Sequence, residues 1–348
     1  MPRPKRCEFQ AAIHLVTVSG YSGGHVFYDP QIFTQFPENP RAHAPDADCF
    51  DDRVWDACEQ YDARVHAYVI EPNTALLVIQ TLGGPLGWIV HDLLARYSKY
   101  LTEKNRIPGG TKPFPRRYKA QIVQPAKLPY VVRYVQRREI AAGQYRRAVN
   151  HPFSSSLIYC GRRSRPECFV VSAMREALAP LGYLGPNAYF EFMAADDSPS
   201  IAYMLSRRII GEQSFADSVR ARCRKPARTP SPDEILREVC GAVLHTGPEI
   251  ASTSTHLGAL ARALVAWYAM RTGTAQIGAV ARWFDVTSAD LRYLIRTHRR
   301  KNPQYFLRSL PELFPALGTR EALPQPAYMM TPGTIRTGSL GVYASLGS

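Results

Sequence analysis

The sequence lacks the features that mark membrane, secreted and zinc-binding proteins. No apolar run reaches the roughly 18 residues that span a bilayer, and the basic start, Met1 to Arg6, has no apolar core of a signal peptide after it. None of the seven cysteines forms a Cys-x-x-Cys pair, so zinc and thioredoxin chemistry have no signal. Scattered cysteines in an odd number fit a reducing compartment. We therefore expect a cytoplasmic protein with no membrane partner.

Acidic residues are also scarce relative to basic ones. The 43 lysines and arginines outnumber the 29 aspartates and glutamates, which gives a formal charge of +14. Such an excess favours polyanionic partners, with nucleic acid ahead of anionic membranes. A basic surface that only improves solubility would explain the same charge, so composition alone leaves both interpretations open.

The first 150 residues alternate between strand and helix patterns. The sequence predicts strands at 11–18, 64–71, 75–82 and 117–124, helices at 51–61, 86–101 and 127–141, and a loop at 35–48. Pro72 and Asn73 predict a turn between the second and third strands. The order β-α-β-β-α-β-α is a ferredoxin-like split βαβ plan with one added helix, and we predict an α+β fold with a first domain at 1–150.

Beyond residue 150 the patterns are helical, and the chain has no internal repeats. Helices are expected at 169–180, 199–209 and 213–223 in a middle region, 151–224. A basic, proline-rich linker at 224–232 precedes an all-α domain at 225–310, with Ser231 and Glu234 as an N-terminal cap. Its helices are expected at 232–244, 256–271, 275–284 and 288–300, before a loose tail at 311–348.

The last two of these helices have the pattern of a helix-turn-helix. The small, turn and core positions of that motif are held by Ala281, Asp285 and Leu291. Asp285 stands where many such motifs have glycine, but aspartate tolerates the left-handed conformation. Thr287 and Asp290 are expected to cap the second helix.

Basic residues on that second helix indicate duplex DNA as a ligand. Ser288, Arg292 and Arg296 are predicted to face a major groove, and Arg299 and Arg300 to hold phosphates. A plain helical hairpin is the alternative, and the basic cluster Arg299-Arg300-Lys301 favours DNA over it.

The segment from Val65 to Gln80 resembles the signature region of the REP-associated tyrosine transposases, a family of HUH single-strand nucleases. The resemblance continues in His14-Leu-Val-Thr-Val, Arg117-Tyr-Lys-Ala and Arg133-Tyr134. The segment Ile210–Val219 resembles the middle region of that family, and the C-terminal helices resemble the DnaA-like helix-turn-helix region that some members carry. The resemblance implies an HUH domain followed by an all-α helix-turn-helix region.

The resemblance also implies a chemistry. In the family, a tyrosine attacks a phosphodiester of single-stranded DNA and forms a 5′-phosphotyrosine link. A divalent metal, Mg or Mn, polarises the scissile phosphate. Tyr134 matches the nucleophile by position, although a tyrosine on an amphipathic helix is often simply part of the core.

The positions of the metal ligands are degenerate in this sequence. The family's Pro-Asn-His-x-His pattern has Thr74 and Leu76 in place of its histidines, and the third ligand position holds Arg138. Leucine has no donor atom, and arginine stays protonated. We therefore predict no bound metal.

Two alternatives would keep a working site. Ligands could be rebuilt from His14, His66, Glu71 or Asn73. Alternatively, Arg138 could supply the positive charge that the metal gave, as a metal-free catalyst.

Cations and tyrosines are interleaved near the predicted active-site side, which is typical of proteins that bind unpaired DNA. The predicted DNA-binding cations of the first domain are Arg116, Arg117, Lys119, Arg133 and Arg137, with Arg146 and Arg147 beyond them. The predicted stacking residues are Tyr97, Tyr100, Tyr118 and Tyr145.

These patterns lead to one hypothesis and two alternatives. The first is a transposase-like protein, monomer or homodimer, that binds single-stranded or hairpin DNA, and also duplex DNA, with cleavage lost or weakened. The second is an active tyrosine transposase with an altered or metal-free site. The third is a helix-turn-helix transcriptional regulator whose first domain is a folded relic.

Overall fold

The structure, a computed structural model, describes residues 8–9, 11–115, 117–141, 151–195, 201–224, 229–243 and 256–307. The N-terminal arm, Arg116, the segment 142–150 with Tyr145, Arg146 and Arg147, residues 225–228 of the proposed linker and the tail 311–348 lie outside these residues. Predictions made for them remain predictions.

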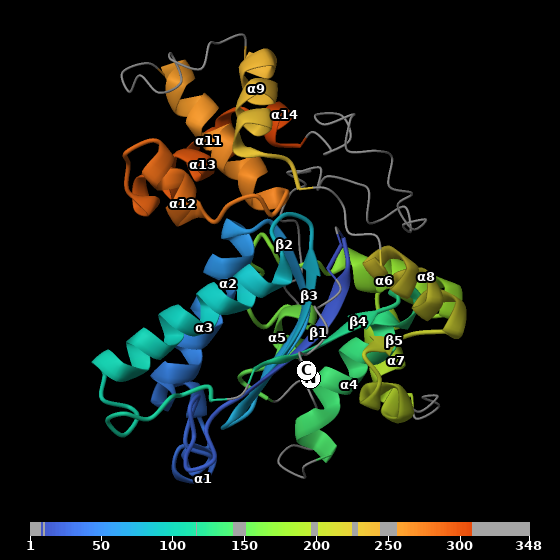
Figure 1. Cartoon of the computed structure of the whole chain (residues 1–348). Coiled ribbons are helices and arrows are strands. Elements are labelled where there is room, and N and C mark those ends of the chain that lie inside the picture. The colour runs from blue at the N-terminus through green and yellow to red at the C-terminus, as the bar shows by residue number, and fades with distance from the viewer. Residues whose placement is uncertain are drawn as a thin grey trace, which may run out of the picture.

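The described chain is a mixed α and β fold built on a five-stranded sheet (Figure 1). The strand order is β2-β3-β1-β4-β5. Strand β1 lies between β3 and β4 and is antiparallel to both, β2 is antiparallel to β3, and β5 is parallel to β4. The strands are β1 (Ile13–Ser19), β2 (Ala63–Ile70), β3 (Thr74–Thr81), β4 (Lys119–Val123) and β5 (Ile209–Ile210).

Helices cover both faces of this sheet (Figure 1). Helices α2 (Pro45–Gln60) and α3 (Leu86–Glu103) pack on one face, against side chains such as Val16 and Leu77. Helix α4 (Leu128–Ala141) packs on the other, against their strand neighbours Leu15 and Leu76. Because successive strand residues point to opposite faces, a strand buried on both sides reads as an almost continuous apolar run.

Helices α6 and α7 of the middle region complete the α4 face of the sheet. Its helices are α5 (Ser156–Tyr159), α6 (Ser172–Leu178), α7 (Ala188–Ala194) and α8 (Gln213–Arg224), with 3-10 turns η4 (Ala179–Leu181) and η5 (Ile201–Ser206). Met174, Leu178 and Phe192 belong to the same apolar cluster as α4. The region also adds strand β5 and bridges from Phe169 and Ser154 to β2. The domain boundaries at 150 and 224 stay predictions.

Two parts of the sequence prediction are wrong. The expected loop at 35–48 contains the 3-10 turn η1 (Pro40–His43) and the start of α2, after the short helix α1 (Ile32–Gln35). Pro45 and Asp46 signal a loop by composition, but both residue types also suit the first turn of a helix. The expected helix at 199–209 is instead η5 followed by β5, whose pairing with β4 is a long-range contact that local patterns do not encode.

The C-terminal part is helical where the sequence predicted it. Its helices are α9 (Pro232–Val243), α11 (His256–Arg271), α12 (Ile277–Trp283), α13 (Ser288–Lys301) and α14 (Pro303–Phe306). Ser231 and Glu234 exchange hydrogen bonds, and Thr287 and Asp290 form a capping box, as predicted. Asp285 has a φ of 50°, the left-handed conformation expected at the turn.

Two further observations concern membrane spans and the cysteines. No helix in the described residues is long and apolar enough to cross a membrane. Cys49, Cys58, Cys160, Cys168 and Cys240 are free thiols, whereas Cys223 is disulfide-bonded. Since disulfides are rare in cytosolic proteins, Cys223 does not support the expectation of a reducing compartment.

Candidate nucleic-acid site around Tyr134

The site begins at the turn between β2 and β3. Pro72 and Asn73 form its tip, and the Glu71 amide donates to the Thr74 carbonyl across 2.7 Å. Asn73 is fixed through its side-chain amide, which donates to the Tyr21 carbonyl at 2.9 Å. Gly20 is needed here because a Cβ at this position would lie 2.1 Å from the Asn73 Oδ1 atom. The turn therefore holds Glu71 and Thr74 at a defined edge of the sheet.

Helix α4 brings Tyr134 and Arg138 to this edge. Val131, Val132 and Val135 anchor the helix on the sheet, which leaves Tyr134 half-buried and Arg138 one turn further on. Arg138 donates from Nε to Glu71 Oε1 at 2.6 Å and from Nη2 to Oε2 at 3.3 Å. Its Nη1 donates to the Tyr134 hydroxyl at 3.0 Å.

This geometry determines the charge at the site. Burial opposes the charged form of Arg138, but the Glu71 carboxylate and the Tyr134 hydroxyl outweigh it and raise the arginine pKa. A two-point guanidinium–carboxylate pair is a strong, directional interaction. Tyr134 thus has a permanent cation beside its hydroxyl, and Glu71 holds that cation in place.

The residues at the family's ligand positions do not fit a divalent metal. Leu76 is 1% exposed and belongs to the apolar cluster under α4. Its position is therefore shielded from water and has no donor atom for a metal. Thr74 offers a hydroxyl alone, and Arg138 places a positive charge where a third ligand would stand. The Glu71 carboxylate, a suitable ligand by type, is already paired with Arg138.

The rebuilt ligand set is not assembled either. No group of three or more histidine, cysteine, aspartate or glutamate side chains suited to a metal occurs in the described residues. His66 is fully buried, and its Nε2 lies 3.1 Å from Gln80 Oε1. Burial lowers the pKa of His66 to about 4, so the ring is neutral at physiological pH.

Strand register places further polar side chains beside the tyrosine. Thr17 of β1 lies opposite Leu76 of β3 and opposite Lys119 of β4, and Ser19 lies opposite Thr74. Directly opposed residues share a face of the sheet, with Cβ atoms about 5 Å apart. Lys119, Thr17, Ser19 and Thr74 therefore lie on the α4 face at the same end as Tyr134.

The predicted DNA-binding cations of the first domain divide into two groups. Arg117 and Lys119 are exposed, and Lys119 donates to the Leu205 carbonyl at 2.8 Å. Arg137 is half-buried, and its Nη1 lies 3.5 Å from the Ala195 carbonyl oxygen. These three remain candidates for contact with DNA.

Arg133 does not fit the prediction. It is 2% exposed, and its Nη1 donates to the carbonyls of Phe192 at 2.7 Å and Ala195 at 3.0 Å. Its guanidinium also lies 4.1 Å from the centre of the Phe192 ring. Arg133 therefore fastens α7 to α4, and it has no surface to offer a ligand.

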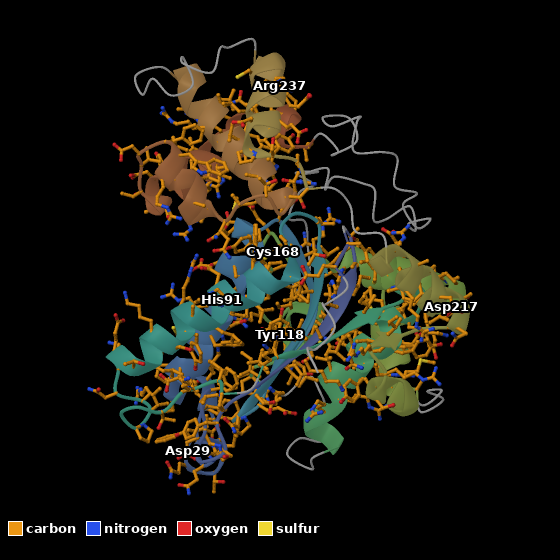
Figure 2. All side chains as sticks on the ribbon, viewed as in Figure 1. Asp29, His91, Tyr118, Cys168, Asp217 and Arg237 are labelled. Carbon is orange, nitrogen blue, oxygen red and sulfur yellow. The ribbon has the colours of Figure 1, made fainter. Side chains whose placement is uncertain are left out.

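The predicted stacking tyrosines are also corrected. Tyr97 is fully buried on the α3 face, where its hydroxyl donates to the Val26 carbonyl at 2.6 Å. Tyr100 lies on the same helix, half-buried, and donates to Asp46 at 2.8 Å. Both are on the opposite side of the sheet from Tyr134. Tyr118, near the middle of the molecule in Figure 2, is half-buried and packs against the α3-side core.

The predicted groove-facing residues of α13 lie against the first domain. Arg292 donates from Nε to Gln60 Oε1 at 2.8 Å, and Arg299 pairs with Asp62 at 3.1 Å. Arg296 lies 3.5 Å from Glu59, Ser288 is half-buried, and Arg300 is exposed. No local pattern in the sequence indicates that the C-terminal helices pack on the corner between α2 and β2.

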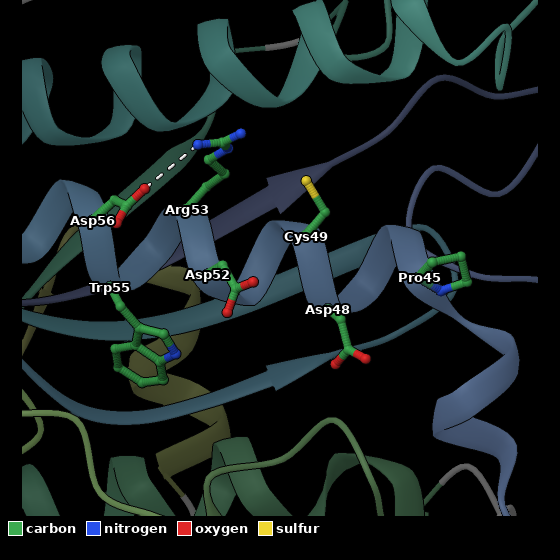
Figure 3. A pocket seen from close by; sticks show the side chains of 7 residues that line it. All are labelled: Pro45, Asp48, Cys49, Asp52, Arg53, Trp55 and Asp56. Carbon is green, nitrogen blue, oxygen red and sulfur yellow. Dashed lines mark hydrogen bonds and ion pairs between the residues drawn. The ribbon is translucent and has the colours of Figure 1, made fainter.

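A hollow on the surface of α2 lies apart from Tyr134. Figure 3 shows Asp48, Asp52 and Trp55 projecting from one side of the helix, and Cys49 and Arg53 from the other. Burial raises the pKa of Asp48, and Arg41 opposes that shift. A surface this rich in carboxylates repels phosphates, so it is not part of a nucleic-acid site.

Comparisons with known proteins give a distant structural relationship. No family model matches the chain, and no curated protein matches it either. A solved structure of a REP-associated tyrosine transposase bound to a REP hairpin is similar over 49% of this chain and 92% of that chain. The identity is 12% and the TM-score is 0.35, values too low to carry a statement about activity.

Proposed function

We propose that this chain is a transposase-like DNA-binding protein that recognises single-stranded or hairpin DNA on the α4 side of its sheet, with metal-dependent strand cleavage lost. The strand order β2-β3-β1-β4, with α2 and α3 on one face, fits the split βαβ plan of an HUH domain. The added helix α4 lies on the other face and carries Tyr134.

The observation that carries the proposal is the contact of Arg138 with both Glu71 and Tyr134. The ion pair stands where the resemblance implies a metal, and Leu76 closes the position beside it. The polar side chains on this face, Lys119, Thr17 and Thr74, suit phosphates and sugar oxygens as donors, and the exposed Arg117 stands two residues before Lys119. The site is therefore suited to binding a DNA strand. It lacks the metal ligands that would be needed to activate a phosphodiester for cleavage.

A gel-shift titration tests the binding part of this proposal. A labelled hairpin, the same bases as an unfoldable single strand, and the same stem as a blunt duplex are compared at fixed salt. We expect retention of the hairpin or the single strand ahead of the blunt duplex. Equal or better retention of the duplex would refute recognition of unpaired DNA by the first domain.

One contact supports a second candidate, a metal-free tyrosine nuclease. The Arg138 guanidinium lies 3.0 Å from the Tyr134 hydroxyl, close enough to stabilise charge that develops on a phosphate attacked by that oxygen. The two-point pair with Glu71 argues against it, because this carboxylate already balances the cation. A covalent protein–DNA product that requires both Tyr134 and Arg138 would establish this function instead.

A transcriptional regulator that acts through α13 alone has less support. Such a helix needs its groove-facing residues free, whereas Arg292 and Arg299 are engaged with Gln60 and Asp62 of the first domain.

A further inference from the structure

Helix α13 has one face fastened to the first domain. Arg299 of α13 and Arg271 of α11 pair with different oxygens of the same carboxylate, Asp62, at 3.1 and 2.8 Å. Asp62 adopts a left-handed φ of 50° at the turn between α2 and β2, which directs the chain into the sheet. Trp267 lies between the two guanidiniums, with its ring centre 4.8 Å from Arg299 and 5.4 Å from Arg271.

The side chain of Arg271 also packs closely on Gly83 at this junction. A Cβ at Gly83 would lie 2.5 Å from the Tyr61 carbonyl oxygen and 3.2 Å from Arg271 Cγ. Cys168 lies where the two parts meet (Figure 2), and burial raises its pKa to about 12. Figure 1 shows the C-terminal helices resting on this end of the sheet and α2. The Arg292–Arg299 face of α13 is therefore a structural contact.

The stripe of α13 beside this contact is exposed. Ala289, Tyr293, Arg296 and Arg300 recur at spacings of four, three and four, which places them on one stripe of the helix. Tyr293 is 67% exposed, and within the described residues no side-chain hydrogen bond, ion pair or ring contact of Tyr293 or Arg300 is present. Arg296 pairs with Glu59 at 3.5 Å, but at 56% exposure such a pair is weak.

We propose that this stripe is a second DNA contact, which binds an unpaired base on Tyr293 and the neighbouring phosphates on Arg296 and Arg300. An exposed aromatic ring between cations suits single-stranded DNA, because every base has a face to stack and every nucleotide a phosphate. A duplex fits poorly. The major groove is about as wide as one helix, and the face of α13 next to the stripe is covered by the corner at Asp62.

The proposal rests on the proposed function, since it names a further contact for the same class of DNA. The stripe lies on the C-terminal helices, apart from Tyr134, so it would hold strand that extends from the part bound on the sheet. Arg292, which the sequence assigned to a groove, and Arg299, which it assigned to phosphates, do not belong to the stripe.

The test uses the full chain and two probes, a blunt hairpin and the same hairpin with a single-stranded extension. Tyr293→Ala is expected to weaken binding of the extended hairpin by about tenfold, since stacking on one base is worth roughly that factor or more. Tyr293→Phe keeps the ring and is expected to bind as the wild type does. The blunt hairpin should not distinguish the three proteins.

Two arginine variants test the two faces of α13 separately, the exposed stripe and the face packed on the first domain. Arg300→Ala is expected to reduce the slope of log affinity against log salt by about 0.7 for the extended probe. Arg299→Ala is expected to lower the melting temperature and to leave the ratio of extended to blunt affinity unchanged.

The outcomes are distinct. If the wild type retains the hairpins and Tyr293→Ala binds the extended probe equally well, the second contact is wrong and the proposed function stands. If Arg299→Ala selectively loses the extended probe, the fastened face is the binding face and the inference is overturned. If the wild type retains neither probe, the proposed function and the inference both fail.

Discussion

Replacement of Arg133 tests whether this residue stabilises the fold or contacts DNA. Its guanidinium donates to two backbone carbonyls and stacks on Phe192 in a site that is 2% exposed. Each charge-assisted hydrogen bond contributes about 1.5–3 kcal/mol, and a desolvated cation–π contact adds about 2 kcal/mol. Allowing for partial relaxation and entry of water, we expect Arg133→Ala to lower the free energy of unfolding by about 4 kcal/mol.

The assay is urea denaturation followed by tryptophan fluorescence, with hairpin affinity measured on the protein that remains folded. Arg137→Ala is the matched control, since Arg137 is a neighbouring arginine of α4 that is half-buried and whose Nη1 lies 3.5 Å from the Ala195 carbonyl oxygen. We expect Arg137→Ala to cost under about 1 kcal/mol and to weaken DNA binding, and Arg133→Ala to show the opposite pattern. If Arg133→Ala keeps wild-type stability and loses DNA binding, Arg133 does not hold α7 against α4 as described.

Further predictions concern pH, the ion pair and the junction. The pKa of about 4 for His66 in the folded protein lies below its unfolded value of about 6.5. As pH falls, the unfolded state therefore binds the proton first. The free energy of unfolding should decrease by about 3 kcal/mol between pH 6.5 and pH 4. His66→Gln should remove that part of the slope in denaturation midpoints measured at each pH; an unchanged slope would mean that His66 is not buried and neutral. Glu71→Gln should free the Arg138 cation, which raises hairpin affinity and steepens its salt dependence by about 0.7; unchanged binding in a salt titration would place the DNA elsewhere. Asp62→Asn keeps the shape of the turn but loses both arginine pairs, so hydrogen exchange in α13 should become faster, and unchanged exchange would mean that apolar packing alone holds the junction.

The sequence predicted those elements whose signals are local. The Pro72-Asn73 turn, the capping pair Thr287–Asp290 and the left-handed Asp285 depend on residues within four positions of one another, and all three are present. The helices of the C-terminal part were predicted for the same reason, since apolar periodicity is a property of each segment alone.

What the sequence could not provide depends on contacts between distant segments. Arg138 meets Glu71 across 67 positions, and Arg299 meets Asp62 across 237. Arg133 and Arg138 look equally exposed on a helical pattern, yet packing of α7 buries the first and leaves the second half-open. A two-residue strand such as β5 has no periodicity of its own and exists because β4 offers a free edge.

These misses share a cause. Arginines were assigned to DNA by charge, but an arginine also satisfies carbonyls, aromatic faces and carboxylates within a fold. Arg117 and Arg300 are exposed and remain candidates for contact with DNA, as does Lys119, which is exposed although its amino group also donates to the Leu205 carbonyl.

The covalent-adduct assay tests the central claim most directly. Wild-type protein and Tyr134→Phe are mixed with a labelled hairpin that carries a single-stranded extension, with and without manganese, and run on parallel native and denaturing gels. We expect both proteins to retain the hairpin equally on the native gel. We expect no covalent band on the denaturing gel, with or without manganese. A covalent band that requires Tyr134 would contradict it, and dependence of that band on manganese would show that Thr74, Leu76 and Arg138 do not mark a lost metal site.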